Sequence, residues 1–565
     1  MSEGAWLMSW AGSPGAAQLE VTAAGTAAAA VREHVATLVD DRVASRLFAK
    51  DPTLWGADAE AESAVRLSWV GSARGSRHLV GEVAAIRGEL GADLDHVVLC
   101  GMGGSSLAPE VICAAAGVAL TVLDSSDPDM VRAAVGDRIE RTVVVVSSKS
   151  GGTLETDSQK RAYEAAFTAA GIDPLQRIIV VTDPGSPLEQ AARAAGYRVV
   201  LADPHVGGRY SALTAFGLVP SGLAGVDLGG LLDEAEGVSD LLAEDAEGNP
   251  GLVLAAALVG SLQAVPPRDK IVLAQDGSGL PGFADWAEQL IAESTGKSGQ
   301  GLLPVVVEGP GAPELRRPGA DVLPVRLVSG TDEGDPGEPG DASTESSAPE
   351  VTITEVTVAG ALGAQLMLWE VATAVAGRLL GINPFDQPDV ESAKKAARGL
   401  LDAPAGDDPA LVVDDIEVRG TPGLLDGVTD LEGAVAALLG RLDPDRGYLS
   451  VMVYLDRSAD AALADVRAPL AERTARPTTF GWGPRFLHST GQYHKGGPST
   501  GVYLQVTGAP HADLEVPGQP FTFGELITAQ AAGDAQVLAD HDRPVLRLHL
   551  RDRSTGVARL AEVLG

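Results

Sequence analysis

The sequence RTVVVVSSKSGGTLET, residues 141–156, decides the fold expected for this chain. Its four consecutive valines, residues 143–146, predict a strand that is buried on both faces of a parallel sheet. A turn rich in serine and glycine follows and leads into a helical stretch that begins near Leu154. Backbone N–H groups, hydroxyl groups and the positive end of the helix dipole then meet at one point. This arrangement predicts an anion site, most simply for a phosphate; the alternative is a tight turn whose serines only cap the helix.

The region around this stretch alternates between strand-like and helical segments. Strands are expected at residues 97–100, 120–123, 142–146, 178–182 and 198–201. The alternation is typical of a doubly wound α/β domain with a mostly parallel sheet, in which ligands bind beyond the C-terminal strand ends. Two more polar turns follow such ends, GMGGSS at residues 101–106 and DSSD at residues 124–127. Three such turns in one sheet make a phosphate site a stronger prediction than one turn alone.

Composition and charge exclude several classes of function. The chain has 565 residues and a formal net charge of -35 at pH 7, so no basic field exists to attract nucleic acid or an anionic membrane. No apolar segment approaches about 18 residues, and the N-terminus lacks a signal-peptide pattern. The two cysteines, Cys100 and Cys113, are too few for a disulfide framework and fit a reducing compartment. We therefore expect a cytoplasmic protein, and no motif predicts a metal or a redox cofactor.

Three charged residues outside the turn are candidates for chemistry. Arg209 lies in VGGRYS, where a fixed planar cation suits an oxyanion, although a single arginine is more often a structural salt-bridge partner. Glu293 lies in QLIAESTGK, near the C-terminal end of a helix expected from about residue 284, where the dipole disfavours a carboxylate. Lys394 follows NPFDQPDVE in the first turns of another helix, a position that opposes the dipole and suggests an anionic partner.

The C-terminal part of the chain suggests a further α/β unit and a further polar site. Strand-like segments occur at residues 411–418, 448–455, 502–506 and 545–550. Between them, residues 479–498 contain both His488 and His494, a lysine and several glycines. A passage with this many polar residues is unsuited to forming only a hydrophobic core, so we expect it to contribute to a functional site.

The composition along the chain predicts four regions. Residues 1–90 read as a helical N-terminal segment, and residues 91–225 and 226–404 as two α/β domains. Residues 329–350, rich in Gly, Pro, Ser and acidic side chains, are expected to be a disordered surface insertion that can be deleted. Residues 405–565 form the additional C-terminal α/β domain.

With these motifs identified, the chain resembles the phosphoglucose isomerases. The matching pieces, in the family's order, are GMGGSS, SKSGGTLET, VGGRYS, QLIAESTGK and NPFDQPDVESAK. The resemblance implies two flavodoxin-like sugar isomerase (SIS) domains with the active site between them. It implies that Glu293 is the base that moves a proton between C2 and C1, that Arg209 stabilises the enediolate and that Lys394 helps to open the sugar ring. It also implies a phosphate subsite made of Ser105, Ser148, Lys149, Ser150 and Thr153.

This chain differs from the family's pattern at the ring-opening histidine. It usually lies between the glutamate and the lysine, and in family dimers it comes from the neighbouring subunit. This chain has no histidine between Glu293 and Lys394. The passage with FLHSTGQYHKGGP resembles the isomerase half of the bifunctional transaldolase/phosphoglucose isomerases. His494 is therefore the first candidate and His488 the second, and a homodimer is a possible assembly.

The expected function is interconversion of glucose 6-phosphate and fructose 6-phosphate through a cis-enediol, a step of glycolysis and gluconeogenesis. This chemistry needs a carboxylate, a cation for the oxyanion and proton relays, without a metal or a redox cofactor. Two alternatives stay open: a related phosphosugar isomerase that acts on mannose 6-phosphate, and a non-catalytic SIS protein that binds sugar phosphates. A sensor has no reason to keep Arg209, Glu293 and Lys394 together, and fold alone does not decide between these functions.

Overall fold

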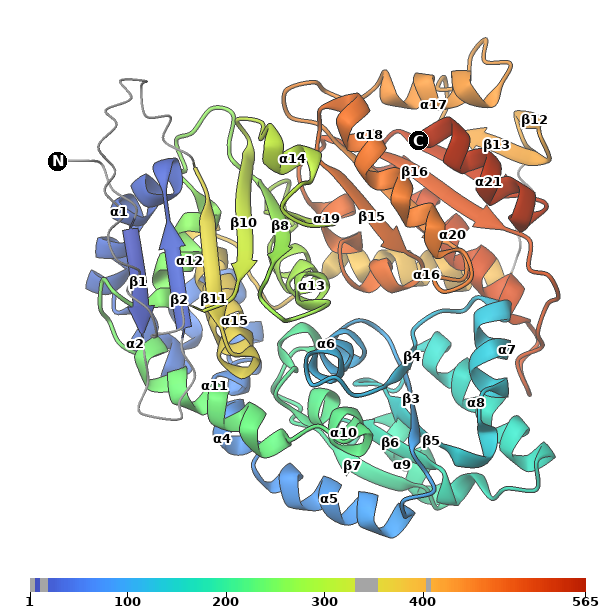
Figure 1. Ribbon diagram of the computed structural model, residues 1–565, viewed down its shortest axis with the longest axis horizontal. Coiled ribbons are helices and arrows are strands. Elements are labelled where there is room, and N and C mark those ends of the chain that lie inside the picture. Colours follow the sequence, from blue (N-terminus) through green and yellow to red (C-terminus); the bar gives the residue numbers. More distant parts are fainter. Residues whose placement is uncertain (1–5, 11–18, 331–353, 403–407) are drawn as a thin grey trace, which may run out of the picture.

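The computed structural model describes residues 6–10, 19–330, 354–402 and 408–565. Three sheets with flanking helices make up the molecule. The helices α6 (Leu107–Ala115), α13 (Phe283–Thr295) and α19 (Gly491–Gly496) lie near the middle, where the three sheets meet (Figure 1). The expected insertion at residues 329–350 lies almost entirely outside the described residues. Within the described ranges, no helix is both long enough and apolar enough to cross a bilayer.

The first sheet has five parallel strands in the order β4-β3-β5-β6-β7. They are β3 (His96–Gly101), β4 (Thr121–Leu123), β5 (Thr142–Ser147), β6 (Ile178–Thr182) and β7 (Arg198–Leu201). Every residue of β5 is buried, as the valine run predicts for a central strand. The helices around this sheet are α5 (His78–Leu90), α6 (Leu107–Ala115), α7 (Pro128–Gly136), α8 (Leu154–Ala169), α9 (Pro187–Ala195) and α10 (Ala215–Ala224).

The second sheet has six strands in the order β1-β2-β11-β10-β8-β9. Its parallel part consists of β8 (Lys270–Asp276), β9 (Leu303–Val307), β10 (Val322–Val328) and β11 (Val356–Gly360). Its helices are α11 (Leu228–Leu242), α12 (Pro250–Val259), α13 (Phe283–Thr295), α14 (Pro313–Arg316), α15 (Leu362–Leu380) and α16 (Pro388–Asp402). The sequence predicts strands at residues 271–275 and 303–307, which correspond to β8 and β9, whereas β10 and β11 were not predicted.

The N-terminal segment is largely helical, as expected, and it also supplies two strands that the sequence analysis did not predict. Its helices are α1 (Gly25–Asp40), α2 (Val43–Phe48), α3 (Ala57–Ser63) and α4 (Ser72–Gly75). The strands β2 (Leu19–Ala23) and β1 (Trp6–Trp10) extend the second sheet in antiparallel fashion beyond β11. They give the outer strand of the parallel sheet a hydrogen-bonding partner.

The third sheet has the order β12-β13-β17-β16-β14-β15. Its strands are β12 (Leu411–Val413), β13 (Ile416–Gly420), β14 (Tyr448–Tyr454), β15 (Thr478–Trp482), β16 (Gly501–Gly508) and β17 (Val545–Leu550). The single strand expected at residues 411–418 is a hairpin, because Asp414 and Asp415 both adopt positive φ and form its turn. The helices here are α17 (Leu431–Leu439), α18 (Arg467–Thr474), α19 (Gly491–Gly496), α20 (Phe523–Asp540) and α21 (Arg553–Leu564).

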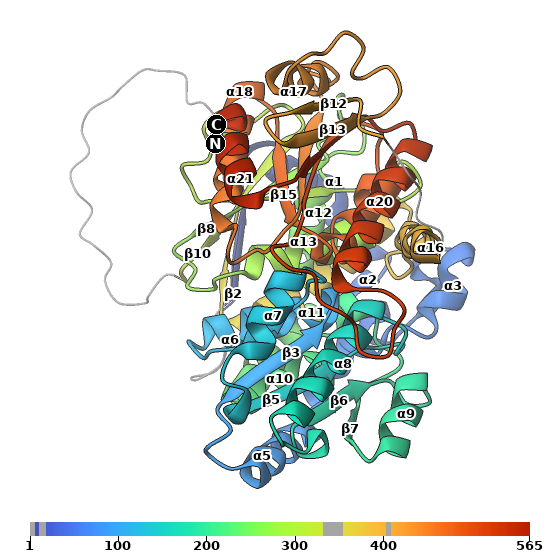
Figure 2. The same ribbon diagram turned by 90° about the vertical axis from the view of Figure 1, so that its right-hand side faces the viewer.

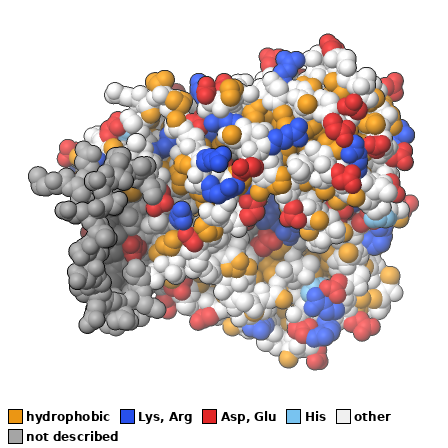
Figure 3. All heavy atoms as spheres, turned by 45° about the horizontal axis from the view of Figure 1, so that its top comes forward, with side chains coloured by type: hydrophobic (Ala, Val, Ile, Leu, Met, Phe, Trp, Pro, Cys, Tyr) orange, Lys and Arg blue, Asp and Glu red, His pale blue; other side chains and the backbone are white. Residues whose placement is uncertain are grey.

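Apolar packing joins the three sheets. Side chains of the second sheet, such as Val272 and Leu303, share a core cluster with Tyr448 and Met452 of the third. Phe523, at the start of α20, packs into the cluster on one face of the first sheet. Figure 2 shows α16 and α20 side by side between the first and third sheets, and Figure 3 shows a hollow near the centre of the molecule with both acidic and basic side chains around it. The C-terminal unit is therefore positioned to reach a site at the first two sheets. The exact domain boundaries stay a prediction.

Candidate active site

The turn between β5 and α8 is closed by its own hydroxyl groups. Ser148 Oγ lies 3.0 Å from Thr153 Oγ1 and accepts a hydrogen bond from the N–H of Gly151. Ser150 Oγ accepts another from the N–H of Gly152. Gly151 has φ +70°, and a Cβ there would lie 2.5 Å from the Cβ of Leu188, so only glycine fits. The turn therefore holds three hydroxyl groups at the N-terminus of a helix, as the sequence predicts.

Lys149 is directed elsewhere. Its ammonium group donates to Asp183 Oδ2 at 2.5 Å and to the carbonyl of Pro204 at 3.4 Å. Burial lowers the pKa of Lys149, and its contact with Asp183 opposes that shift. The side chain thus anchors the turn to the segments after β6 and β7, and its predicted role as a phosphate ligand has no support from this geometry.

Ser105 lies beside the end of β5. A Cβ added to Gly101 would lie 3.2 Å from both the Ser105 Cβ and the carbonyl oxygen of Ser147. Next to it, Gly104 packs so tightly against Gly208 that a Cβ would overlap the Gly208 carbonyl group. This close approach brings η6 (Gly208–Tyr210), which carries the predicted arginine, against the GMGGSS turn.

Arg209 and Glu293 form a buried pair. Arg209 Nη1 lies 3.3 Å from Glu293 Oε1, and the two residues are 3% and 9% exposed. The remaining donors of the guanidinium group reach Ser294 Oγ, Gln387 Oε1 and the carbonyl of Pro384. These bonds use the fork geometry of arginine and fix the cation next to the carboxylate.

Lys297, also from the ESTGK motif, holds the NPFDQP turn. Its ammonium group donates to the carbonyls of Asn383 and Asp386 at 2.8 and 2.7 Å and to Asp386 Oδ1 at 2.7 Å. That turn leads directly into α16, which carries Lys394. Arg209 and Lys297 together therefore fix the start of the helix on which the predicted ring-opening lysine lies.

His488 reaches the site from the third sheet, in η8 (Arg485–His488). Its Nε2 lies 3.4 Å from Glu155 Oε1, which also accepts a hydrogen bond from Gln530 Nε2 at 2.7 Å. Gln289 Nε2 donates to the backbone carbonyl of His488 at 2.6 Å and to Glu293 Oε2 at 3.1 Å. One amide group thus connects the histidine segment to the predicted base.

The carboxyl group of Glu155 is buried and remains ionised. Burial acts to raise its pKa, but the hydrogen bond and the positive charge of His488 outweigh burial and hold the pKa below its usual value. Lys394 contributes in the same direction.

The structure does not bring His494 into this group. His494, in α19, is 1% exposed, and its ring nitrogens lie 3.0 Å from the Tyr448 hydroxyl and 3.2 Å from Ser450 Oγ. Burial holds its pKa well below the usual value. The ring is therefore a neutral core group beneath the third sheet, and of the two predicted histidines only His488 faces the candidate site.

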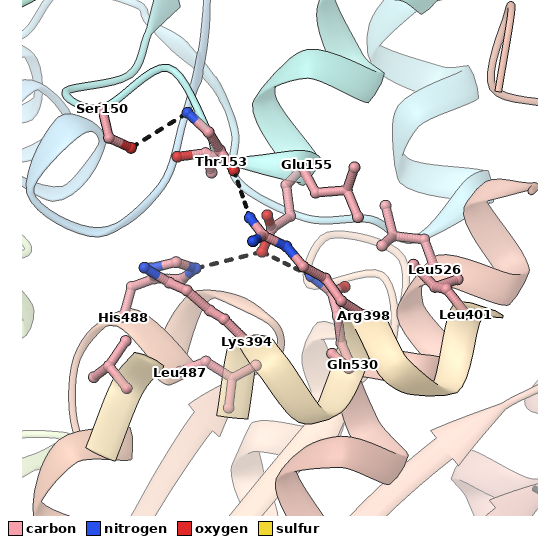
Figure 4. Close-up of a pocket in the computed structure, with 14 residues that line it drawn as sticks. Ser150, Thr153, Glu155, Lys394, Arg398, Leu401, Leu487, His488, Leu526 and Gln530 are labelled. Carbon is pink, nitrogen blue, oxygen red and sulfur yellow. Dashed lines mark hydrogen bonds and ion pairs between the residues drawn. The ribbon is translucent and has the colours of Figure 1, made fainter. Parts of the chain in front are cut away.

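A cavity of about 230 Å³ adjoins these residues (Figure 4). Its lining comes from the phosphate-type turn and α8, from α16, and from the third unit, and consists of Ser150, Gly152, Thr153, Leu154, Glu155, Val390, Lys394, Ala397, Arg398, Leu401, Leu487, His488, Leu526 and Gln530. Of the predicted site residues, Ser150, Thr153, Lys394 and His488 line it. Arg209 and Glu293 lie next to it, connected through Gln289.

The sequence analysis missed three residues of this site. Glu155 lies within the quoted SKSGGTLET motif, but a carboxylate in the first helical turn is easily explained by the helix dipole alone. Gln289 lies four residues before Glu293, a spacing that puts both on one helix face and could have identified it. Gln530 lies far along the chain in α20 and carries no local signal.

Comparison with known proteins supports one family. The family model described as phosphoglucose isomerase matches residues 76–301. The glucose-6-phosphate isomerase of Thermosynechococcus vestitus is 31% identical over 56% of this chain and 68% of its own length, and a probable glucose-6-phosphate isomerase of Haloarcula marismortui is 31% identical over 57% and 81%. This chain belongs to the phosphoglucose isomerase family.

Two further comparisons show how much of the chain is similar to known proteins. The glucose-6-phosphate isomerase of Rippkaea orientalis is 32% identical over 54% of this chain and 65% of its own length, so the chain spans about two thirds of such relatives. The crystal structure of a hypothetical protein from Thermus thermophilus superimposes with a TM-score of 0.56 at 25% identity, covering 67% of this chain and 99% of that one. The family match ends at residue 301, before α16 and the third sheet.

Proposed function

We propose that this phosphoglucose isomerase family member interconverts glucose 6-phosphate and fructose 6-phosphate. The observation that carries the proposal is the linked group of Arg209, Glu293, Gln289 and His488 beside the cavity. It combines a carboxylate, a fixed cation and an imidazole, the three kinds of group that an enediol mechanism needs. The names of the relatives support the same substrate pair.

The proposed reaction begins with ring opening. The substrate phosphate binds the turn that contains Ser150 and Thr153, with Ser105 and Ser148 at its base. His488, positioned by Glu155, donates a proton to the ring oxygen as the C1–O5 bond breaks, and the proton of the C1 hydroxyl passes to a solvent water next to Lys394. The open-chain aldehyde results. This assignment moves the ring-opening role from His494 to His488.

The proton transfer follows on the open chain. Glu293 removes the proton from C2, and the electron pair of that bond forms the C1–C2 double bond of the enediol. The hydroxyl proton on O2 passes to O1, and the carboxyl group of Glu293 returns its proton to C1 to give the ketose. Arg209, 3.3 Å from Glu293, stabilises the negative charge that develops on the oxygens.

A coupled assay of fructose 6-phosphate conversion to glucose 6-phosphate, run in EDTA, tests the proposal. Turnover with a normal response to substrate concentration is expected. Mannose 6-phosphate is measured in parallel, and preference for it would replace the proposed substrate with the related phosphosugar. Binding of sugar phosphates without turnover would contradict the proposal and favour the non-catalytic alternative. A homodimer and a cytoplasmic location stay predictions, although the group of residues described above is assembled from one chain.

Activity is expected to fall on the alkaline side as Lys297 loses its proton. Burial and the neighbouring charge of Arg209 lower the pKa of Lys297 to about 8. Above that pH the neutral amine no longer holds the carbonyls of the NPFDQP turn as strongly, so α16 and Lys394 lose their fixed position. The pH profile of kcat/KM should therefore show an alkaline limb near pH 8, which Lys297→Arg should move upward because a guanidinium stays charged.

The stability of the fold should respond to this titration in the opposite direction. The pKa of Lys297 is lower in the folded chain than its ordinary value of 10.5, so deprotonation between about pH 8 and 10.5 favours the folded state. Retained Tm together with falling activity between pH 8 and 9 is the expected result. An alkaline limb that is identical in Lys297→Arg would contradict this assignment.

A further inference from the structure

The phosphate subsite of the proposed function lacks an obvious cation. A sugar phosphate carries close to two negative charges at neutral pH, and this chain has a formal net charge of -35. The lysine within the turn, Lys149, is engaged with Asp183 at 2.5 Å. A local positive charge is needed to offset the repulsion between such a substrate and the protein as a whole.

Two cationic side chains line the cavity, and both come from α16. Lys394 and Arg398 are four residues apart, so they lie on the same face of the helix. The charge of Lys394 acts on Glu155, the carboxylate that contacts His488. Arg398 lies instead at the turn: its Nη2 donates to the carbonyl of Gly152 at 3.0 Å. Figure 4 shows its guanidinium group between α16 and the turn that carries Thr153.

The hydrogen bond that Arg398 makes uses little of the bonding capacity of its guanidinium group. A guanidinium has five N–H donors, and here one reaches a neutral backbone carbonyl at an exposed position. An anionic phosphate oxygen is a better acceptor, because charge-assisted and bidentate hydrogen bonds are shorter and about twice as strong as neutral ones. Gly152 itself lies between Ser150 and Thr153, whose hydroxyls line the same cavity. A phosphate on those hydroxyls would lie within reach of the arginine.

We propose that Arg398 is the cation of the phosphate subsite and binds the substrate phosphate directly. It supplies the charge that Lys149, despite its place in the turn, does not. The inference rests on the proposed function for the identity of the substrate, but the subsite itself can be tested with inorganic phosphate alone. Arg398 is then a substrate-binding residue that acts on affinity and not on the proton-transfer steps.

The test compares Arg398→Gln and Arg398→Lys with wild type and with Arg193→Gln in the full chain. Arg193 is a matched control, an exposed arginine on α9 of the same sheet that pairs with Glu189 of its own helix. Phosphate affinity is measured by isothermal titration calorimetry, and KM and kcat with fructose 6-phosphate. Loss of one charged hydrogen-bonding group at an accessible site should weaken phosphate binding and raise KM about tenfold in Arg398→Gln, with kcat nearly unchanged. Arg398→Lys should recover part of this loss, and added salt should reduce the difference between wild type and Arg398→Gln.

The outcomes separate this inference from the proposed function. Weaker phosphate binding in Arg398→Gln than in Arg193→Gln supports the subsite even if the chain proves to lack isomerase activity. Equal phosphate affinity in the two variants would overturn the inference. So would a loss of kcat at unchanged phosphate affinity, which would assign the Arg398 contact to the structure of α16. A wild-type chain that binds no phosphate up to millimolar concentrations would overturn it as well.

Discussion

Glu293→Gln should lower kcat for fructose 6-phosphate by at least about 10²-fold, and by as much as about 10⁴-fold, the range typical of general base catalysis. The amide cannot accept the proton that this direction of the reaction removes from C1, although it keeps the size of the side chain and can still bond to Gln289. Because Glu293 does not line the cavity at the phosphate turn, KM and the affinity for inorganic phosphate should change little. The measurement is steady-state kinetics combined with phosphate titration.

Glu82→Gln is the matched control for this change. Glu82 lies on α5 with its side chain in solvent, so the same carboxylate-to-amide substitution should leave kcat unchanged. Near-normal turnover in Glu293→Gln would remove this residue from the mechanism. A fall in phosphate affinity as large as the fall in kcat would instead indicate that the substitution disrupts the structure of the site. A lowered Tm of the variant would then be expected.

His488→Gln should lower kcat/KM by about 10²-fold, because the ring-opening step loses its proton donor. Glu155 would retain its hydrogen bond from Gln530 and keep its place, so the phosphate subsite should remain intact. The loss should be smaller when the assay follows exchange of the C2 proton on substrate that is already open. That difference assigns the defect to ring opening rather than to proton transfer.

His494→Gln is the contrasting variant, since the sequence favoured His494 for the same role. Its ring lies between the Tyr448 hydroxyl and Ser450 in the core, where loss of a buried hydrogen bond costs about 1–3 kcal/mol. The expected result is a lower Tm with kcat of the folded protein largely retained. If His494→Gln instead lost turnover at unchanged Tm while His488→Gln stayed active, the assignment made from the structure would be wrong.

Dilution of the wild-type protein tests whether one chain is sufficient for activity. His488 and Gln530 both contact Glu155 within the same chain. The specific activity of the wild-type protein should therefore stay constant on dilution, even if the oligomeric state changes. Light scattering at the same concentrations measures the oligomeric state. Activity that falls in step with dissociation would indicate that a second copy contributes to the site.

The sequence alone determined the elements whose signals are local. The valine run predicted a buried central strand, and β5 is buried at every position. The SKSGGT turn, the arginine of VGGRYS and the glutamate of ESTGK could be identified because glycines, hydroxyls and helix ends act over a few residues. The strands β1, β2, β10 and β11 were not predicted, because nothing in their composition distinguishes them from other apolar segments and pairing partners far along the chain define them.

Tertiary structure alone decided which of these residues lie together. From the sequence, Lys149 is predicted to be a phosphate ligand, but in the structure its ammonium group lies 2.5 Å from the Asp183 carboxylate. His488 and His494 are six residues apart, and the sequence ranked His494 first, yet the path of η8 and α19 puts His488 against Glu155 and His494 in the core. Local spacing fixes which way a side chain can point from its own element, but its partners depend on how distant elements pack. Contacts such as those of His488 with Glu155 and Gln289 therefore exist only in the folded chain.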